Sequence, residues 1–365
     1  MCRGLVFATA LLLSVFVPAL ACAQWQMQDS HSTVGLRGIH AVNDSIAWAT
    51  GSEGTILRTV DGGAHWQRCS PPPGAEKLDF RGVWAWGANN AMILSSGPSE
   101  QSRVYKTTDG CAHWTEELRN HDKDGFWDAL VFQSADFGLL GNDHTGVLFG
   151  DPVNGRFATQ VLVQGNGWLV DERSCAARTG EAGFAASNSS VVMFGPRRYM
   201  IVTGGTAGSR VLISPLMACN DNQKDCQKEC LRIALPLAGG AESSGAFSIA
   251  FRDLNHGVVV GGDYKNPELA GGTAAWTSDG GRHWTASRKT PHGYRSAVAW
   301  VSRYDWIAVG TNGSDVSRDD GQSWEHLDSG KWNAVSPPFA VGPGGRIGKL
   351  EASAFQNRSA PSLSR

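Results

Sequence analysis

A turn pattern of eight residues occurs four times in this chain and restricts its possible folds more than any other feature. Each copy reads Ser/Thr-x-Asp-x-Gly-x-x-Trp, the Asp-box, with Cys111 in place of the glycine in the second copy. The Asp carboxylate accepts bonds from N–H groups of its own turn, the glycine tolerates positive φ, and the Trp buries a large side chain against the next hairpin. We therefore expect structural roles for Asp61, Trp66, Asp109, Trp114, Asp279, Trp284, Asp319 and Trp324.

The Asp-boxes stand within longer repeats that predict an all-β fold. The chain has 45 Gly, 14 Trp and only 18% charged residues, a composition typical of short strands joined by Gly-rich turns. Strand-like segments at 36–42, 46–51 and 55–59 precede the first box, and the same order returns later in the chain. The spacing from Trp66 to Trp114 is the length of one propeller blade.

Counting these repeats predicts a seven-bladed β-propeller of four-stranded antiparallel blades over residues 24–350. Two degenerate blades fill residues 126–168 and 184–237, and the segment after Trp332 supplies most of the last blade. Its missing strand is expected from residues 24–28, because a ring closed by the N-terminal strand leaves no exposed sheet edge. We expect a monomer with a disordered C-terminal tail, residues 351–365.

The N-terminus has the order and size of a secretory signal. Residues 1–23 contain one positive charge followed by an apolar stretch that ends in small residues. Cleavage before Gln24 is favoured over cleavage before Cys22, and lipidation at Cys22 or retention as an uncleaved anchor are less favoured alternatives. The sequence thus predicts a periplasmic or secreted protein with no integral membrane span after signal cleavage.

The cysteines that remain after signal removal predict disulfides, as expected for an exported protein. Three of them share one polar loop, and we expect two of these three to form a local disulfide. A zinc site is the alternative, but it needs a fourth ligand and no His lies nearby. The six cysteines are Cys69, Cys111, Cys175, Cys219, Cys226 and Cys230.

The segments 51–63 and 255–262 resemble the photosystem II stability/assembly factor family, whose members are propellers with Asp-boxes, also called bacterial neuraminidase repeats. This resemblance implies an exported or lumenal propeller that assists assembly of a reaction-centre subunit and does not catalyse a reaction. Segments 151–157 and 181–187 and the cysteine loop depart from the pattern. They indicate a separate bacterial branch that shares the scaffold rather than the photosynthetic partner.

Three arginines form the candidate binding site. Arg37, Arg81 and Arg295 are expected at one repeat position in three blades, around one mouth of the central channel. Such a cluster suits an acidic peptide segment or a carboxylated sugar, whereas the alternative is that each Arg pairs with a nearby carboxylate and orders its loop. Turns expected on the same face add Glu53, Asp151, Asp263, Tyr264 and Asp315.

These features favour a non-catalytic binding or assembly propeller that recognises a protein partner in the cell envelope or another carboxylate-bearing ligand. The alternative is a glycoside hydrolase or a carbohydrate-binding Asp-box propeller, with Asp151 and Asp263 as the two carboxylates that hydrolysis needs. Sialidases carry an Arg-Ile-Pro signature that is absent here. No nucleophile or dinucleotide motif is present, so we expect no cofactor; we also expect no metal, and a net charge of −2 gives no reason to expect nucleic acid.

Overall fold

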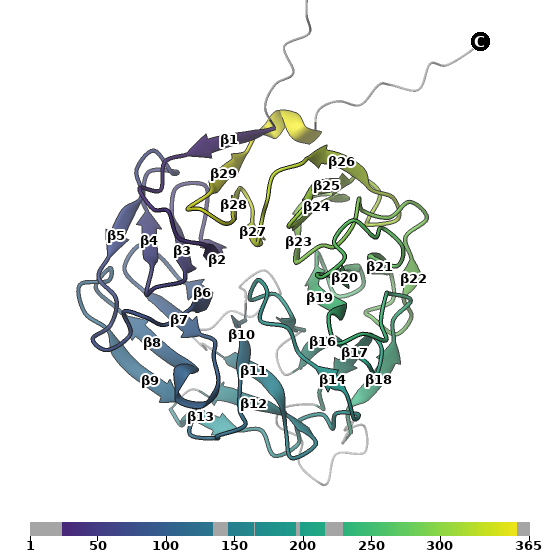
Figure 1. Cartoon of the computed structure of the whole chain (residues 1–365), viewed down its shortest axis with the longest axis horizontal. Coiled ribbons are helices and arrows are strands. Elements are labelled where there is room, and N and C mark those ends of the chain that lie inside the picture. The colour runs from purple at the N-terminus through teal and green to yellow at the C-terminus, as the bar shows by residue number, and fades with distance from the viewer. Residues whose placement is uncertain (1–23, 134–144, 164, 195–197, 216–228, 356–365) are drawn as a thin grey trace, which may run out of the picture.

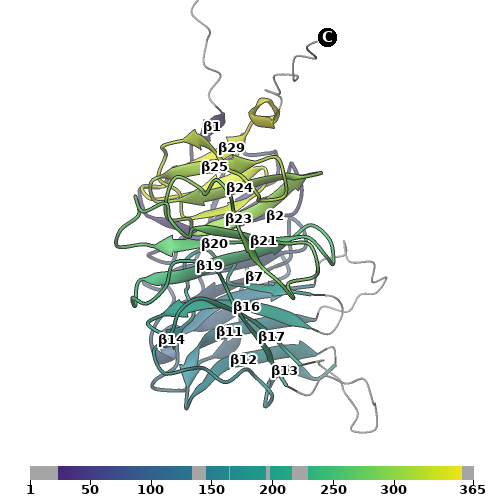
Figure 2. The same ribbon diagram turned by 90° about the vertical axis from the view of Figure 1, so that its right-hand side faces the viewer.

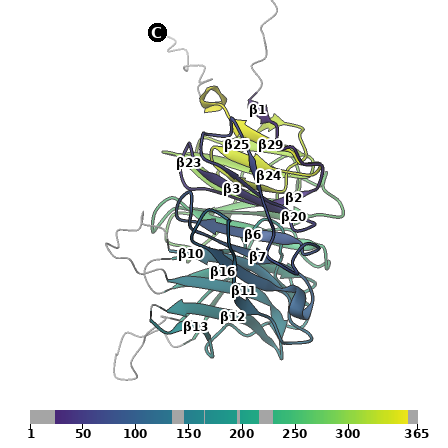
Figure 3. The ribbon, with the colours of Figure 1, turned by 90° about the vertical axis from the view of Figure 1, so that its left-hand side faces the viewer.

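Short antiparallel strands form nearly all of the regular structure. A computed structural model describes residues 24–355 apart from 134–144, 164, 195–197 and 216–228. In that part of the chain the only helices are two short 3-10 turns, η1 (Ser99–Gln101) and η3 (Ala352–Phe355), and no helix is long and apolar enough to cross a membrane. The sheets form a ring (Figure 1) that is narrower along its axis than across it (Figures 2 and 3).

Three four-stranded sheets come first along the chain, each with its strands in sequence order. The first consists of β2 (Leu36–Ala41), β3 (Ala47–Gly51), β4 (Ile56–Thr59) and β5 (Gln67–Cys69). The second consists of β6 (Phe80–Ala85), β7 (Ala91–Ser95), β8 (Arg103–Thr107) and β9 (Thr115–Arg119). The third, where a degenerate repeat was expected, consists of β10 (Trp127–Phe132), β11 (Gly146–Val153), β12 (Arg156–Val163) and β13 (Gly167–Val170).

A nine-stranded sheet follows, in which two groups of strands meet at one residue pair, Gly204 with Gly245. The first group is β14 (Glu181–Ala182), β15 (Val191–Met193), β16 (Tyr199–Gly205), β17 (Arg210–Ile213) and β18 (Leu231–Ala234). The second is β19 (Ser244–Phe251), β20 (Gly257–Asp263), β21 (Ala274–Thr277) and β22 (Thr285–Ala286). Both β14 and β15 pair with β16, so the innermost strand of the first group is interrupted.

Two further sheets complete the ring. The first consists of β23 (Ala297–Ser302), β24 (Asp305–Gly310), β25 (Gly313–Ser317) and β26 (Glu325–Asp328). The last combines both ends of the chain, β27 (Ala334–Ser336), β28 (Phe339–Val341), β29 (Ile347–Leu350) and β1 (Trp25–Gln28).

The N-terminal strand closes the ring, as the sequence predicted. Trp25 lies opposite Leu350 and Gln28 opposite Ile347 in the antiparallel pair of β1 and β29. The indole of Trp25 packs 4.9 Å from that of Trp332, and its Nε1 donates to Ser314 Oγ of the preceding sheet. Both backbone pairing and side-chain packing therefore hold the first described strand, β1, to the last part of the ring.

Side-chain hydrogen bonds close the turn of each Asp-box segment. In the first box Asp61 Oδ1 accepts from the His65 N–H at 3.0 Å, and Asp61 Oδ2 contacts His65 Nδ1 at 2.7 Å. The box residue Thr59 accepts from the Gly63 N–H, so the side chains satisfy the donors of the turn. The Trp packs against the preceding sheet rather than the next hairpin, since Trp66 contacts Phe339 and Trp114 contacts Trp48.

Two disulfides join distant parts of the chain. Cys69 at the end of β5 bonds to Cys111 in the second Asp-box, and so links the first two sheets. Cys175 bonds to Cys230. A local disulfide that uses Cys230 is therefore wrong, because a partner outside the loop holds its sulfur, while Cys219 and Cys226 lie outside the described residues.

The Asp-box carboxylates predict a loss of stability in acid. Hydrogen bonds from the His65 backbone and ring lower the pKa of Asp61 from 3.8 to about 2, and those from the His113 ring and backbone do the same for Asp109. A carboxylate whose pKa is lower in the folded state stabilises the fold at pH values above its unfolded pKa. This stabilisation is lost as the pH falls through the folded pKa. We expect the wild-type Tm to fall between pH 3.8 and about 2 more steeply than that of D61N/D109N. Parallel Tm curves for the two proteins would contradict this role, and D124N serves as an exposed control.

Candidate functional site

The innermost strands carry β-bulges near their starts, and these bulges define the candidate site. In β2, β6, β10 and β19 the register shifts around one extra residue. A bulge re-aims the side chain of that residue relative to the alternation of the strand. The four bulged residues are Arg37, Arg81, Asp128 and Phe247.

All four bulged side chains line one pocket of about 440 Å3. Because β2, β6, β10 and β19 lie nearest the ring axis (Figure 1), the pocket is at the centre of the ring. Ser296 and Asn333, which directly precede β23 and β27, line it as well. The remaining lining residues are Phe126, Asp151, Gly183, Phe184, Ala185, Ala186, Tyr264, Tyr294 and Thr311.

Arg37 and Arg81 give one side of the pocket a positive charge. Arg81 Nε donates to Asp79 Oδ2 at 2.7 Å and its Nη1 to the Ala185 carbonyl at 3.2 Å. Within the described residues, the buried Nε of Arg37 has no hydrogen-bond partner. Burial, and then the charge of Arg81, lower the pKa of Arg37 from its ordinary value. The pocket thus contains an incompletely satisfied guanidinium beside a second one, an arrangement suited to an anion.

Asp128 and Asp151 add two carboxyl groups to the same pocket. Asp128 is 1% exposed, and its Oδ2 has no hydrogen-bond partner within the described part of the chain. Burial, followed by the nearby charge of Asp151, raises the pKa of Asp128 well above its ordinary value. Burial also raises the pKa of Asp151, although Asp151 Oδ1 accepts from the Gly183 N–H at 2.8 Å. Sequence reasoning missed Asp128.

The interruption between β14 and β15 forms a plug across the ring, residues 183–189. Asn188 Nδ2 donates to the carbonyls of Val83 and Leu130, and Asn188 Oδ1 accepts from the Leu130 N–H at 2.7 Å. Ser187 Oγ donates to the Ser296 carbonyl, and the Ser189 carbonyl accepts from the Ile249 N–H. The plug therefore bonds to the inner strands β6, β10 and β19 and to the segment before β23.

Aromatic rings form a wall that lines the part of the pocket around β19. Phe184 of the plug stacks on Phe247 at 3.9 Å between ring centroids. Tyr294 and Tyr264 meet Phe247 edge-on at 4.8 Å and 6.2 Å. This wall buries Phe247 and Tyr294 almost completely, whereas Tyr264 is 46% exposed. The pocket therefore offers an apolar surface beside its charges.

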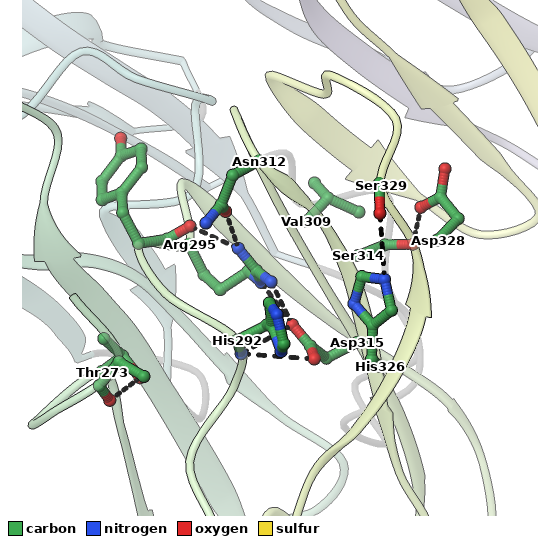
Figure 4. Close-up of polar contacts among 12 residues, drawn as sticks. Thr273, His292, Arg295, Val309, Asn312, Ser314, Asp315, His326, Asp328 and Ser329 are labelled. Atoms are coloured by element: carbon green, nitrogen blue, oxygen red, sulfur yellow. Dashed lines mark hydrogen bonds and ion pairs between the residues drawn. The ribbon is translucent and has the colours of Figure 1, made fainter. Parts of the chain in front are cut away.

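Arg295 does not share the position of the other two arginines. Its side chain is fully buried, and Nε donates to Asp315 Oδ2 at 2.6 Å (Figure 4). Nη1 donates to Asn312 Oδ1 and to the Tyr294 carbonyl, while the His292 N–H donates to Asp315. Arg295 and Asp315 thus stabilise their own sheet, and neither lines the pocket.

Arg295 does not line the pocket because it stands one residue earlier in its repeat than Arg37 and Arg81 do in theirs. Arg37 and Arg81 each stand between a large residue and a small one, Leu36 and Gly38 in the first case. In the sixth repeat the large residue is Arg295 itself, and Ser296 occupies the middle position before Ala297. Moving a strand residue by one place sends its side chain to the other face. The pattern of a large residue, a variable residue and a small residue also occurs around Asp128, Ser296 and Asn333. Reading its middle position would have predicted these three residues as part of the pocket lining.

The turn residues expected on the binding face are dispersed. Tyr264 and Asp151 line the pocket, but Glu53 and Asp263 do not. Glu53 is exposed at a positive φ of 54°. Asp263 Oδ2 accepts from Asn266 Nδ2 at 2.8 Å, and this bond lowers the pKa of Asp263. Of the two carboxylates of the hydrolase hypothesis, therefore, only Asp151 lines the pocket. The described residues also contain no group of three or more metal-ligating side chains.

Comparison with known proteins identifies the fold. No protein-family model and no curated protein matches the chain. The structure is similar to YCF48 bound to D1 peptide, with 16% identity over 92% of this chain and 99% of that chain and a TM-score of 0.59. It is also similar to the RRP9 WD40 repeats, with 13% identity, coverage of 91% and 98%, and a TM-score of 0.57. Identities this low show the fold alone: the chain is an all-β protein with a β-propeller fold.

The hydrogen bonds of Asn188 in the plug predict that its replacement destabilises the fold. Asn188 has a positive φ of 64°, which glycine adopts without strain, so N188G removes the three hydrogen bonds but not the backbone conformation. We expect N188G to lower the free energy of unfolding by about 2–4 kcal/mol, because it leaves the Leu130 N–H and two carbonyls unsatisfied. Chemical denaturation measures this loss. N154G, at an exposed turn with a similar φ of 51°, is the matched control. Equal stability of N188G and N154G would show that the plug does not hold the ring together.

Proposed function

We propose that this chain is an exported, non-catalytic binding propeller whose central pocket holds a carboxylate-bearing segment of a partner protein in the cell envelope. The single observation that carries the proposal is the pair Arg37 and Arg81 in one pocket, with Nε of Arg37 buried and without a hydrogen-bond partner among the described residues. Guanidinium groups bind carboxylates through paired N–H donors, and a partly desolvated site strengthens such bonds.

A protein ligand suits the pocket better than a small acid alone. The pocket lies on the ring axis and is bordered by aromatic rings, so a side-chain carboxylate and the apolar atoms next to it both find contacts. The similar structure of YCF48 holds a D1 peptide, which supports peptide binding by a propeller of this kind. Carboxylated sugars share the anionic group and remain the second class of ligand that the binding experiment compares.

Two features of the chain support export. The structure contains two disulfides, which persist in oxidising compartments, and the first 23 residues have the pattern of a secretory signal. We propose that the mature protein begins at Gln24 and that the propeller spans residues 24–350. The expected disordered tail is wrong for its described first residues, because η3 (Ala352–Phe355) follows the last strand, the Ala354 carbonyl accepts from Arg318, and Phe355 packs against a hydrophobic cluster of the ring. The mature protein acts as a monomer in this proposal, since the ring closes on itself.

The packing supports seven blades in the ring. Val202 and Val211 of the nine-stranded sheet pack against Ile249 and Val259 of the same sheet in one hydrophobic cluster. Strands that pack face to face belong to separate layers, although Gly204 and Gly245 link them at one point. Counting these layers separately, and adding the other five sheets, gives seven blades.

The binding proposal predicts that R37Q/R81Q loses the partner without losing the fold. Each lost charge-assisted bond is expected to weaken binding by about 1.5–3 kcal/mol, and high salt is expected to weaken the wild-type complex. Pull-down from cell-envelope extract at low and high salt, followed by mass spectrometry, measures the effect. R68Q, an exposed arginine on outer strand β5, is the matched control. Identical partner sets for wild type, R68Q and R37Q/R81Q would contradict the proposal.

Competition separates the two ligand classes in the same pull-down. A peptide rich in Glu is expected to displace the captured partner at lower concentration than polygalacturonate, because the peptide also offers apolar atoms to the aromatic wall. The reverse order would assign the pocket to carboxylated sugars.

The export proposal predicts the termini and thiols of the purified protein. Mass spectrometry of protein isolated from the periplasm or medium is expected to find Gln24 as the first residue and non-reduced peptides that join Cys69 to Cys111 and Cys175 to Cys230. Recovery of the protein only from the cytoplasmic fraction, with an intact N-terminus and free thiols at these four positions, would contradict export.

A further inference from the structure

The two acidic residues of the central pocket form a feature that the proposed function does not use. Asp128 follows Arg81 at the equivalent bulge of the next sheet, and Asp151 lies on the neighbouring strand β11. The pocket therefore changes from basic to acidic along the ring. We propose that Asp128 and Asp151 form a cation subsite, so that the pocket binds a ligand that carries an ammonium group and a carboxylate together.

Geometry supports a ligand contact at Asp128. Its side chain is almost completely buried, it lines the pocket, and its Oδ2 has no hydrogen-bond partner within the described residues. The ion pair of Arg81 is with Asp79, and no ion pair joins Arg81 to Asp128 in the described part of the chain. Burial favours the protonated form of Asp128, and an ammonium donor would favour the carboxylate and so offset that penalty.

Asp151 directs a second carboxyl group to the same place. Its Oδ1 is held by the Gly183 N–H of the plug, which fixes the orientation of the group. The pocket surface beside Gly183 lies next to Asp128, because a Cβ at this glycine would meet Asp128 Oδ2 at 2.3 Å. The absence of a side chain at Gly183 therefore lets the plug backbone pack directly against this carboxyl group. Two carboxyl groups provide acceptors for an ammonium group, which donates three hydrogen bonds.

The remaining walls suit the middle of such a ligand. Phe184 and Phe247 stack between the plug and β19, and Tyr294 meets Phe247 edge-on. Apolar rings favour the methylene groups that separate an amine from a carboxylate. A ligand with both charges would place its carboxylate at Arg37 and Arg81 and its ammonium at Asp128 and Asp151. This inference rests on the proposed function for the carboxylate half only.

The test compares ligands that differ by one charge. Calorimetry measures the binding of ε-aminocaproate, caproate and hexylamine, with γ-aminobutyrate as a shorter zwitterion. We expect ε-aminocaproate to bind the wild type at least about tenfold more tightly than caproate, which corresponds to about 1.4 kcal/mol. In D128N/D151N the two acids are expected to bind equally, and R37Q/R81Q is expected to lose both. Thermal unfolding checks that the Asn variants fold, and D151N alone replaces the double variant if they do not.

The results test the carboxylate site and the cation subsite separately. Equal binding of caproate and ε-aminocaproate by the wild type would overturn the cation subsite and leave the carboxylate site intact. Binding of hexylamine without caproate would overturn the proposed function and support the acidic subsite. No binding of any probe would overturn both. An acetylated and amidated peptide with one Lys and one Glu identifies the source: tighter binding than ε-aminocaproate indicates a protein segment, and weaker binding indicates a free zwitterion.

Discussion

The bulge near the start of the inner strands is the constraint on which the rest of the site depends. A regular strand would alternate its side chains between the two neighbouring sheets and leave the ring axis to backbone. One extra residue turns a side chain toward the axis in β2, β6, β10 and β19, and these residues are Arg37, Arg81, Asp128 and Phe247. The sheets thus build the scaffold by repetition, while the bulged position of these four inner strands departs from the regular alternation and contributes a side chain to the pocket.

Buried polar contacts hold the ring where repetition fails. The fourth repeat has lost a continuous inner strand, and the plug replaces its contacts through Asn188, which bonds to two other inner strands. The same repeat pairs Glu181 with Arg210, and the sixth repeat pairs Arg295 with Asp315 at equivalent places with the charges exchanged. Removing one partner of such a pair leaves an uncompensated buried charge, and none of these four residues lines the pocket.

The sequence predicted an all-β propeller because its repeats are local patterns that recur along the chain, and it predicted closure by the N-terminal strand because the last repeat is incomplete. The contacts of Asp61 follow from residues a few positions apart, whereas the pairing of Trp25 with Leu350 was inferred from the strand that the last repeat lacks. The site was predicted in part: Arg37, Arg81, Asp151 and Tyr264 line the pocket. Arg295 was assigned one residue out of register, because its repeat has an arginine where the others have an apolar residue. The partner of Cys230 and the contacts of Asn188 depend on segments far apart in the chain, and no local pattern encodes them.

The central claim is that the bulged residues converge on one pocket that binds a carboxylate. Anomalous diffraction from crystals soaked in a brominated caproate tests it most directly, because the bromine locates the ligand independently of the fitted chain. We predict a bromine peak inside the central pocket, with the carboxylate within hydrogen-bond distance of Arg37 and Arg81 and with Arg295 bonded to Asp315. A ligand bound elsewhere on the ring, or Arg295 turned into the pocket in place of Ser296, would contradict the account.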